Sequence, residues 1–179
     1  LLQEAREIIA GCIHATPEEI FFTSGGSESD NWAIKGLLEK DDYRQTVTSS
    51  FEHHAILHSC ETIERLGFPV SYVSPDHSGH VTVDALARAL TKKTKLVSIM
   101  MSNNELGTIQ PIKELCEIAH AHGALFHTDA VQSMGHIPID VRELGVDMMS
   151  ASSHKFNGPK GIGFLYIRKG TRIRPYMDG

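Results

Sequence analysis

The sequence predicts a three-layer α/β domain in which a mainly parallel, seven-stranded sheet is flanked by helices. The first observation is that short apolar runs alternate with segments of helical periodicity along the chain, a pattern typical of parallel strands joined by crossover helices. The second is the length of 179 residues, which is enough for a substantial core. The third is that no repeat, low-complexity segment or linker interrupts the chain, so residues 1–179 are interpreted as one domain.

The expected strands are short and apolar, and polar residues follow most of them. The run Leu96–Met101 is apolar almost throughout, which is typical of a strand buried on both faces of a parallel sheet. In chain order the candidates are Ile20–Ser24, Thr46–Ser50, Val70–Val73, Leu96–Met101, Ala124–Thr128, Asp147–Ser152 and Ile162–Ile167. Helical periodicity predicts helices over Ser27–Glu39, His54–Leu66, Val83–Ala89 and Pro111–His122, and the chain begins inside a further amphipathic helix.

The composition excludes several classes of protein. A hydrophobic content of 41% and a charged content of 22% are typical of a globular domain. The net charge of −5 is spread along the chain without a basic stripe, so no nucleic-acid partner is expected. No apolar stretch approaches the roughly 18 residues that span a bilayer, and no signal peptide opens the chain. We therefore expect a cytoplasmic protein without a membrane partner.

The cysteine pattern favours free thiols over a disulfide framework or a zinc site. The three cysteines are odd in number, and none lies in a C-x-x-C motif. Free thiols of this kind are typical of a reducing compartment. Cys12, Cys60 and Cys116 are all interpreted as packing residues.

The segment TSGGSESDN (23–31) lies between a predicted strand and a predicted helix. Ligands of open parallel sheets gather at the carboxyl ends of the strands, and glycines there let backbone N–H groups approach a phosphate at the positive end of the helix. Gly26 and Ser27 are the candidate ligands. The alternative is a plain turn in which Ser27 is the N-cap and Asp30 completes a capping box, and the residues alone leave both interpretations open.

Histidines follow the strand that ends at Ser50. The imidazole of His53 could stack on an aromatic cofactor and transfer protons near neutral pH, although a surface histidine is the commoner case. His54 and His58 have the i, i+4 spacing of metal ligands. Because no third ligand lies nearby in the sequence, solvent-facing histidines are expected instead, and no metal site is predicted.

Two more strand ends carry polar groups. The segment SNNELG (102–107) offers consecutive amides after Leu96–Met101, and a polar turn is its plainer interpretation. In the segment HTDAVQ (127–132), Asp129 would place a carboxylate at the edge of the sheet. Such a group suits a buried cation, and an N-cap aspartate is its alternative.

The segment SSHKFNGPKG (152–161) places Lys155 between a strand end and a loop rich in glycine and proline. A lysine in such a position could be desolvated, as a Schiff-base lysine requires. Most lysines are plain surface residues, which is the alternative. The functional interpretation gains weight because five strand ends of one domain each offer a plausible ligand group.

Together the segments resemble the class V aminotransferase family, and specifically its cysteine desulfurase (NifS-like) branch. The resemblance covers nearly the whole chain from Ile20 onward, and it is carried by FTSGGSESDN (22–31), EHHAI (52–56), SNNELG (102–107), HTDAVQS (127–133) and SSHKFNGPKG (152–161). It implies the large domain of a fold type I transferase that depends on pyridoxal 5'-phosphate (PLP). The family's N-terminal segment and C-terminal small domain are expected to be missing from residues 1–179.

The resemblance also implies a role for each site residue. Lys155 would form the Schiff base with PLP and later transfer protons, and Asp129 would keep the pyridinium nitrogen protonated. His53 would stack on the ring and assist proton transfer. The other cofactor ligands would be Asn104 and Gln132 at the phenolic oxygen or the substrate, and Gly26, Ser27, Ser152 and His154 at the phosphate.

The activity implied by the resemblance is conversion of L-cysteine to L-alanine, with the sulfur passed on as an enzyme persulfide. The family's nucleophilic cysteine lies well beyond its Schiff-base lysine, so residues 1–179 alone are expected not to complete turnover. A homodimer and a sulfur-acceptor protein, as in iron–sulfur cluster assembly, are also implied. A selenocysteine lyase or another class V enzyme, and a non-catalytic scaffold of the same fold, remain the alternatives.

Overall fold

The computed structural model describes residues 1–40 and 42–177, and its strands form one seven-stranded sheet in the order β1-β7-β6-β5-β4-β2-β3. The strands are β1 (Ile20–Thr23), β2 (Gln45–Ser49), β3 (Val70–Val73), β4 (Thr94–Ser98), β5 (Leu125–Asp129), β6 (Met148–Ser152) and β7 (Gly163–Ile167). Every expected strand is present within a few residues of its predicted bounds. The predicted α/β fold with a seven-stranded sheet is therefore confirmed.

Strand β7 alone runs against the direction of the others. Strands β3, β2, β4, β5 and β6 pair in parallel, whereas β7 pairs antiparallel with both β6 and β1. A parallel connection needs a crossover of roughly a dozen or more residues, usually a helix. Only a loop with the short 3-10 helix η2 (Ser153–Phe156) joins β6 to β7, so the chain returns beside β6 in the opposite direction.

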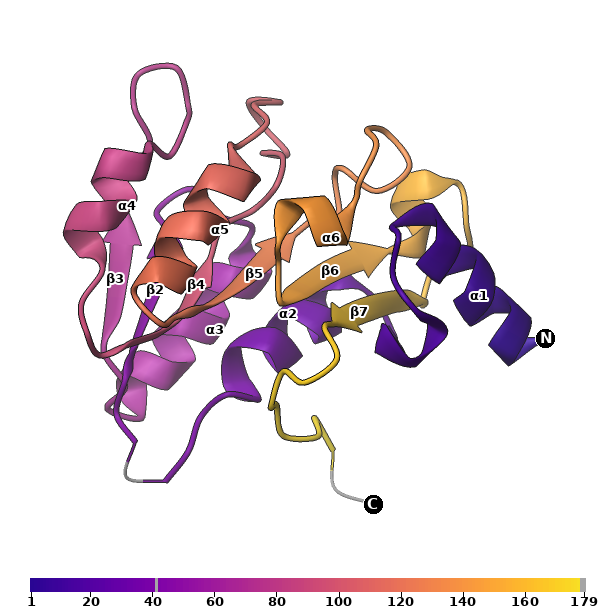
Figure 1. The fold of residues 1–179 in the computed structure, drawn as a ribbon, viewed down its shortest axis with the longest axis horizontal. Coiled ribbons are helices and arrows are strands. Elements are labelled where there is room, and N and C mark those ends of the chain that lie inside the picture. The colour runs from indigo at the N-terminus through magenta and orange to yellow at the C-terminus, as the bar shows by residue number, and fades with distance from the viewer. Residues whose placement is uncertain (41, 178–179) are drawn as a thin grey trace.

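Helices cover both faces of the sheet and complete the three layers (Figure 1). One face carries α2 (Gly26–Lys35) and α3 (His54–Arg65), whose apolar residues form one core cluster with the sheet. The other face carries α1 (Leu2–Cys12), α4 (Val83–Ala89), α5 (Ile112–Ala121) and α6 (Val141–Leu144). The remaining element is the 3-10 helix η1 (Pro17–Glu19) before β1.

The alternation of side chains along β7 shows how both layers of the core are filled. Phe164 and Tyr166 are buried with the cluster under α1, α5 and α6, whereas Leu165 and Ile167 are buried with the cluster under α2 and α3. Since successive side chains of a strand point to opposite faces, a strand covered on both sides must be apolar throughout. This burial explains the continuous apolar runs in the sequence.

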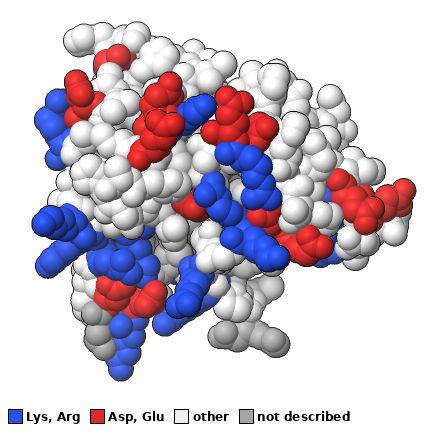
Figure 2. All heavy atoms as spheres, in the orientation of Figure 1, with Lys and Arg blue, Asp and Glu red and all other residues white. Residues whose placement is uncertain are grey.

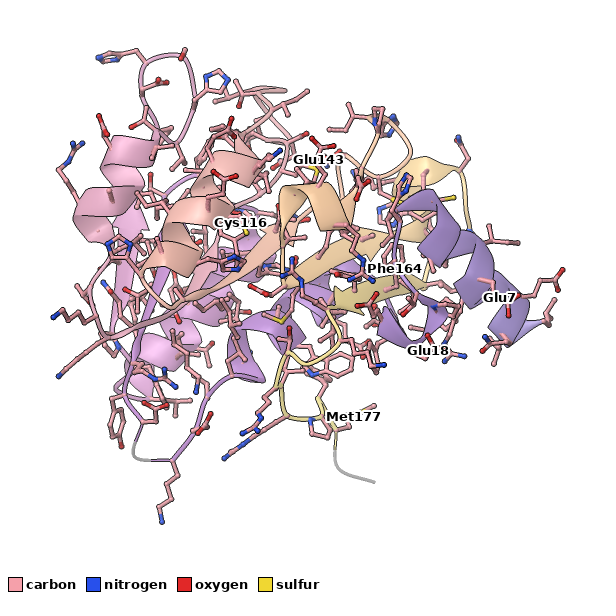
Figure 3. The ribbon with its side chains drawn as sticks, viewed as in Figure 1. Glu7, Glu18, Cys116, Glu143, Phe164 and Met177 are labelled. Atoms are coloured by element: carbon pink, nitrogen blue, oxygen red, sulfur yellow. The ribbon has the colours of Figure 1, made fainter. Side chains whose placement is uncertain are left out.

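Several sequence-based details were wrong. Helix α2 ends at Lys35, not Glu39, and the carbonyl of Gly36 just beyond it accepts a hydrogen bond of 2.9 Å from the backbone N–H of Arg174. The short elements α6 and η2 were not predicted as helices. Cys12 is exposed and is not a packing residue, whereas Cys60 and Cys116, the latter labelled on α5 in Figure 3, are buried as predicted.

The surface carries both signs of charge. Figure 2 shows acidic and basic side chains interspersed on one face, with most of the Lys and Arg side chains in its lower half. Across the described residues, none of the helices has the length and apolar character needed to cross a membrane.

Candidate functional site

A cavity of about 310 Å³ lies at the carboxyl ends of the parallel strands. All nine residues predicted for the cofactor site line it: Gly26, Ser27, His53, Asn104, Asp129, Gln132, Ser152, His154 and Lys155. The strand ends bring them together because β1, β2, β4, β5 and β6 all point to the same edge of the sheet. Asp30, Met100 and Val131 complete the lining, and these three were not predicted.

One end of the cavity is formed by the N-terminus of α2. The N-cap is Gly25, which has no side chain to cap the helix. The carboxylate of Glu28 turns back and accepts hydrogen bonds from the backbone N–H and the hydroxyl of Ser24. A Cβ atom at Gly26 would lie only 2.6 Å from Cγ2 of Val131, so glycine allows the helix end to approach the cavity this closely. The capping-box alternative is wrong, since Gly25 is the N-cap and Ser27 already lies inside α2.

The same end also receives groups from the end of β6. The hydroxyl of Ser152 and Nδ1 of His154 are 2.9 Å apart and share a hydrogen bond. A second hollow, of about 330 Å³, is lined by both residues together with Gly26 and Ser27. Helix N–H groups, hydroxyls and an imidazole together can bind a phosphate.

Asp129, the last residue of β5, lies on the floor of the cavity and is 4% exposed. The backbone N–H of Val131 donates to its Oδ1 over 2.9 Å. Among the described residues, Oδ2 has no hydrogen-bond partner. The aspartate therefore stabilises the turn that follows β5 with one oxygen and leaves the other available to a ligand.

Lys155 reaches the cavity from η2, directly after β6, and is half-buried. The imidazole of His136 donates to the Lys155 carbonyl oxygen over 2.9 Å, and Asn157 ends the turn with a φ of 65°. These contacts fix the backbone of a four-residue element that periodicity could not detect. They hold the lysine in the wall of the cavity.

His53 is the N-cap of α3, with Nδ1 accepting a hydrogen bond of 3.1 Å from the backbone N–H of Ala55. In the neutral ring the proton is therefore on Nε2, the nitrogen directed away from the helix. His54 and His58 are exposed and their rings stack with a centroid separation of 5.2 Å. The described residues contain no group of three or more His, Cys, Asp and Glu that could hold a metal ion.

The two consecutive amides of SNNELG have different roles. Asn103 is buried, its Nδ2 donates to the Phe51 carbonyl, and its Oδ1 accepts from the backbone N–H groups of Glu105 and Leu106. Asn104 is exposed and lines the cavity. One amide thus builds the loop, and the other is free to meet a ligand.

Three buried carboxyl groups lie at or beside the cavity floor: Asp30, Glu52 and Asp129. Burial raises the pKa of Asp129 and raises that of Glu52 to about 8. Burial also raises the pKa of Asp30, and the negative charge of Asp129 raises it further. Asp30 was not predicted from the sequence as a site residue. It lies on the face of α2 that also carries Gly26, Ala33 and Ile34. A charged residue on such a small and apolar helix face is a signal that could have identified it.

Comparisons with known proteins identify the family of this chain. The family model described as Aminotransferase class-V matches residues 1–179. A cysteine desulfurase IscS of Dictyoglomus turgidum is 54% identical over 99% of this chain and 46% of its own length. One of Methanosarcina thermophila is 53% identical over 98% of this chain and 44% of its own length. The chain thus spans about half the length of these curated relatives.

Solved structures show the same fold. A structure described as SspA in complex with cysteine superimposes with a TM-score of 0.96 at 44% identity, over 99% of this chain and 52% of its own. One described as a NifS-like protein has a TM-score of 0.96 at 43% identity, over 99% and 50% of the two chains. The chain belongs to the class V aminotransferase family, in the branch that includes the cysteine desulfurases.

Proposed function

We propose that the protein is a PLP-dependent cysteine desulfurase that converts L-cysteine to L-alanine, and that residues 1–179 are its cofactor-binding large domain. The observation that supports this most is the single cavity lined by all nine residues predicted from the motifs. Relatives named cysteine desulfurase at about half identity support the same activity. The solved relative described as a complex with cysteine supports the substrate.

The described residues fit PLP in three respects. A Cβ atom at Gly26 would clash with Val131, so glycine lets the N-terminus of α2 lie at the cavity, where its backbone N–H groups can bind a phosphate. Asp129 presents a buried carboxyl oxygen without a protein partner, which suits a protonated pyridine nitrogen. Among the described residues that line this cavity, Lys155 is the only lysine.

When bound, PLP supplies an electron sink for the bonds at the α-carbon of the amino acid. Gly26, Ser27, Ser152 and His154 would hold its phosphate, and Asn104 and Gln132 would bond the ring oxygen or the substrate. Lys155 would hold the cofactor covalently through Nζ and afterwards carry protons at that nitrogen. His53, with its Nε2–H available, would lie on the ring face and assist proton transfer.

A thiolate that accepts the sulfur would come from outside these residues. None of the three cysteines lines the cavity. Burial raises the pKa of the Cys60 and Cys116 thiols to about 12, so neither would be ionised near neutral pH. The persulfide route, the homodimer, a sulfur-acceptor protein and a cytoplasmic location all belong to this proposal.

The test of cofactor binding is absorbance titration of the full-length protein with PLP, followed by reduction with borohydride and peptide mapping. We expect a covalent adduct at Lys155 that is absent from Lys155→Ala. Lys169→Ala, an exposed lysine after β7, is the matched control and should label like the parent. An adduct elsewhere, or none, would contradict the assignment.

The test of the reaction is sulfide and alanine release from L-cysteine in the presence of a thiol reductant. Equimolar sulfide and alanine are expected. Release of an oxo acid without sulfide would indicate a transaminase, and a strong preference for selenocysteine would indicate a lyase of that substrate. A folded protein that binds PLP but turns over no amino acid would indicate a scaffold.

A further inference from the structure

Asp30 is a buried acid at the cavity that the proposed mechanism does not use. The residue is 1% exposed, it lines the cavity from the first turns of α2, and its Oδ1 has no hydrogen-bond partner among the described residues. A buried, unpaired carboxylate costs several kcal/mol in proteins and is avoided unless the group is neutralised. The position of Asp30 therefore needs an explanation.

The nearest basic group, the imidazole of His127, is uncharged and therefore does not neutralise Asp30. Nε2 of His127 lies 3.8 Å from Oδ1 of Asp30. Each nitrogen of this fully buried imidazole already meets a serine hydroxyl, Nδ1 that of Ser98 at 2.8 Å and Nε2 that of Ser150 at 2.9 Å. Burial lowers the pKa of His127 to about 3, so the ring is neutral at physiological pH.

The other titratable groups that face Asp30 are acids. Asp129 projects from the end of β5 and Glu52 from the loop before α3, and the negative charge of each raises the pKa of Asp30, while the Ser150 hydroxyl acts in the opposite direction. Glu52 is bound by the backbone N–H of Met100 through both oxygens, at 3.0 and 3.1 Å. Two interacting carboxyl groups in a low-dielectric site cannot both ionise readily, so one of them keeps its proton.

We infer that Asp30 is a positioning residue that is held as the neutral carboxylic acid beside Asp129, so that the two groups together carry one negative charge, located on Asp129. The inference rests on the proposed function, since Asp129 is the group expected to meet the pyridine nitrogen. The acid form of Asp30 avoids a second charge on the cavity floor. Its O–H is a potential donor on the cavity lining that Asp30 shares with Asp129.

The proton on Asp30 is tested directly by infrared difference spectroscopy of the full-length, cofactor-free protein at pH 7. Bands of protonated carboxyl groups are expected in the parent, one of which disappears in Asp30→Asn and another in Glu52→Gln. Asp84→Asn, an exposed position on α4, is the matched control and should leave them all. An unchanged set of bands in Asp30→Asn would overturn the inference.

The interaction with Asp129 is tested by titrating the same bands. In Asp129→Asn the Asp30 band should be lost at a pH at least one unit lower than in the parent, because the neighbouring charge is gone. A merely structural role of Asp30 would leave its titration unmoved by this change. Because no cofactor is present, these results stand whether or not the protein proves to be a desulfurase.

The role toward the cofactor is tested by equilibrium PLP binding at pH 7. Asp30→Asn, which mimics the neutral acid, should bind PLP within about twofold of the parent, whereas Asp30→Leu, which lacks the donor, should bind about tenfold more weakly. Circular dichroism identifies variants that fail to fold, and the Asn variant keeps the test valid if Leu is not tolerated. Equal losses in both variants would mean that the charge of Asp30 is needed, which contradicts the inference.

Discussion

Buried carboxyl groups lie at both ends of the sheet, and the number of their hydrogen-bond partners differs between the two ends. At the amino ends of the strands, Glu19 precedes β1 and accepts hydrogen bonds from the backbone N–H groups of Thr16 and Lys169 at 2.9 and 2.8 Å and from the guanidinium of Arg142. Asp147 precedes β6, and its Oδ2 accepts from the Phe126 N–H at 2.8 Å and from His120 at 2.7 Å.

The two acids that line the cavity at the carboxyl ends have far fewer partners, whereas Glu52 beside the cavity accepts from the Met100 N–H and the Ser49 hydroxyl. Asp129 accepts one backbone hydrogen bond, and Asp30 has an oxygen with no partner among the described residues. Burial would raise the pKa of Glu19, but its backbone and Arg142 partners outweigh burial and lower it, whereas burial raises the pKa of both Asp30 and Asp129. Fully paired acids stabilise the fold, and underpaired acids are retained where a ligand uses them.

The largest effect on stability is expected from breaking a paired acid at the amino ends. Glu19→Ala would leave the buried N–H groups of Thr16 and Lys169 without their acceptor and remove the partner of Arg142. We expect a loss of about 2–4 kcal/mol in the free energy of unfolding, measured by urea denaturation at pH 7.

The matched control is Glu18→Ala, an exposed acid in the same 3-10 helix, which should stay close to the parent. Because the pKa of Glu19 is lowered by folding, its contribution is present above its ordinary pKa and is lost as the pH falls through the lowered value. A loss of less than about 1 kcal/mol at pH 7 would contradict the distinction between the two ends.

The contribution of Glu52 to stability should depend on pH in the opposite direction to that of Glu19, and Glu52→Gln should remove it. An acid whose pKa rises to about 8 on folding stabilises the fold below its ordinary pKa of 4.5 and loses that contribution as the pH rises towards 8. The parent should therefore lose about 1–2 kcal/mol more than Glu52→Gln between pH 6.5 and 8, in unfolding experiments at both pH values.

This window avoids the opposite titration of His127, whose pKa changes from 6.5 to about 3 on folding and which destabilises the fold only in acid. Glu61→Gln, exposed on α3, is the control and should keep the parental slope. Identical slopes in the parent and in Glu52→Gln would show that Glu52 is already ionised at pH 6.5.

Asp129→Asn should weaken PLP binding without lowering the stability of the fold. The amide can still accept from the Val131 N–H without a buried charge, so the cofactor-free protein should be as stable as the parent or more stable by up to about 1 kcal/mol at pH 8. PLP binding should weaken at the same time. A destabilised apoprotein would mean that Asp129, like Glu19, is needed mainly for the fold.

The carboxyl end could be predicted from the sequence because a parallel sheet brings residues from several strand ends to one edge, and the family resemblance implies which of them form the site. Once Asp129, Lys155 and the glycines at 25–26 were located just after strands, a parallel sheet had to bring them to one edge. The local motifs then needed no knowledge of long-range contacts.

Other features depend on such contacts and could not be read from local patterns. Helix α2 ends early where a segment more than a hundred residues away bonds to Gly36. The capping pattern at Ser27 and Asp30 was plausible locally, but α2 begins earlier, with Gly25 as its N-cap, and Ser27 and Asp30 both lie inside the helix. The four residues of α6 are too few to show a period.

The smallest effect is expected for an ion pair that is not buried. Lys113 on α5 and Glu143 on α6, the latter labelled in Figure 3, are 3.5 Å apart with side chains 48% and 69% exposed. Lys113→Ala should change the free energy of unfolding by less than about 0.5 kcal/mol, since solvent screens the pair and its side chains lose entropy on pairing. The measurement is urea denaturation at low and at 1 M salt, where the parent and the variant should converge. If this variant lost as much stability as Glu19→Ala, pairing alone, and not burial with complete hydrogen bonding, would account for the contrast between the two ends of the sheet.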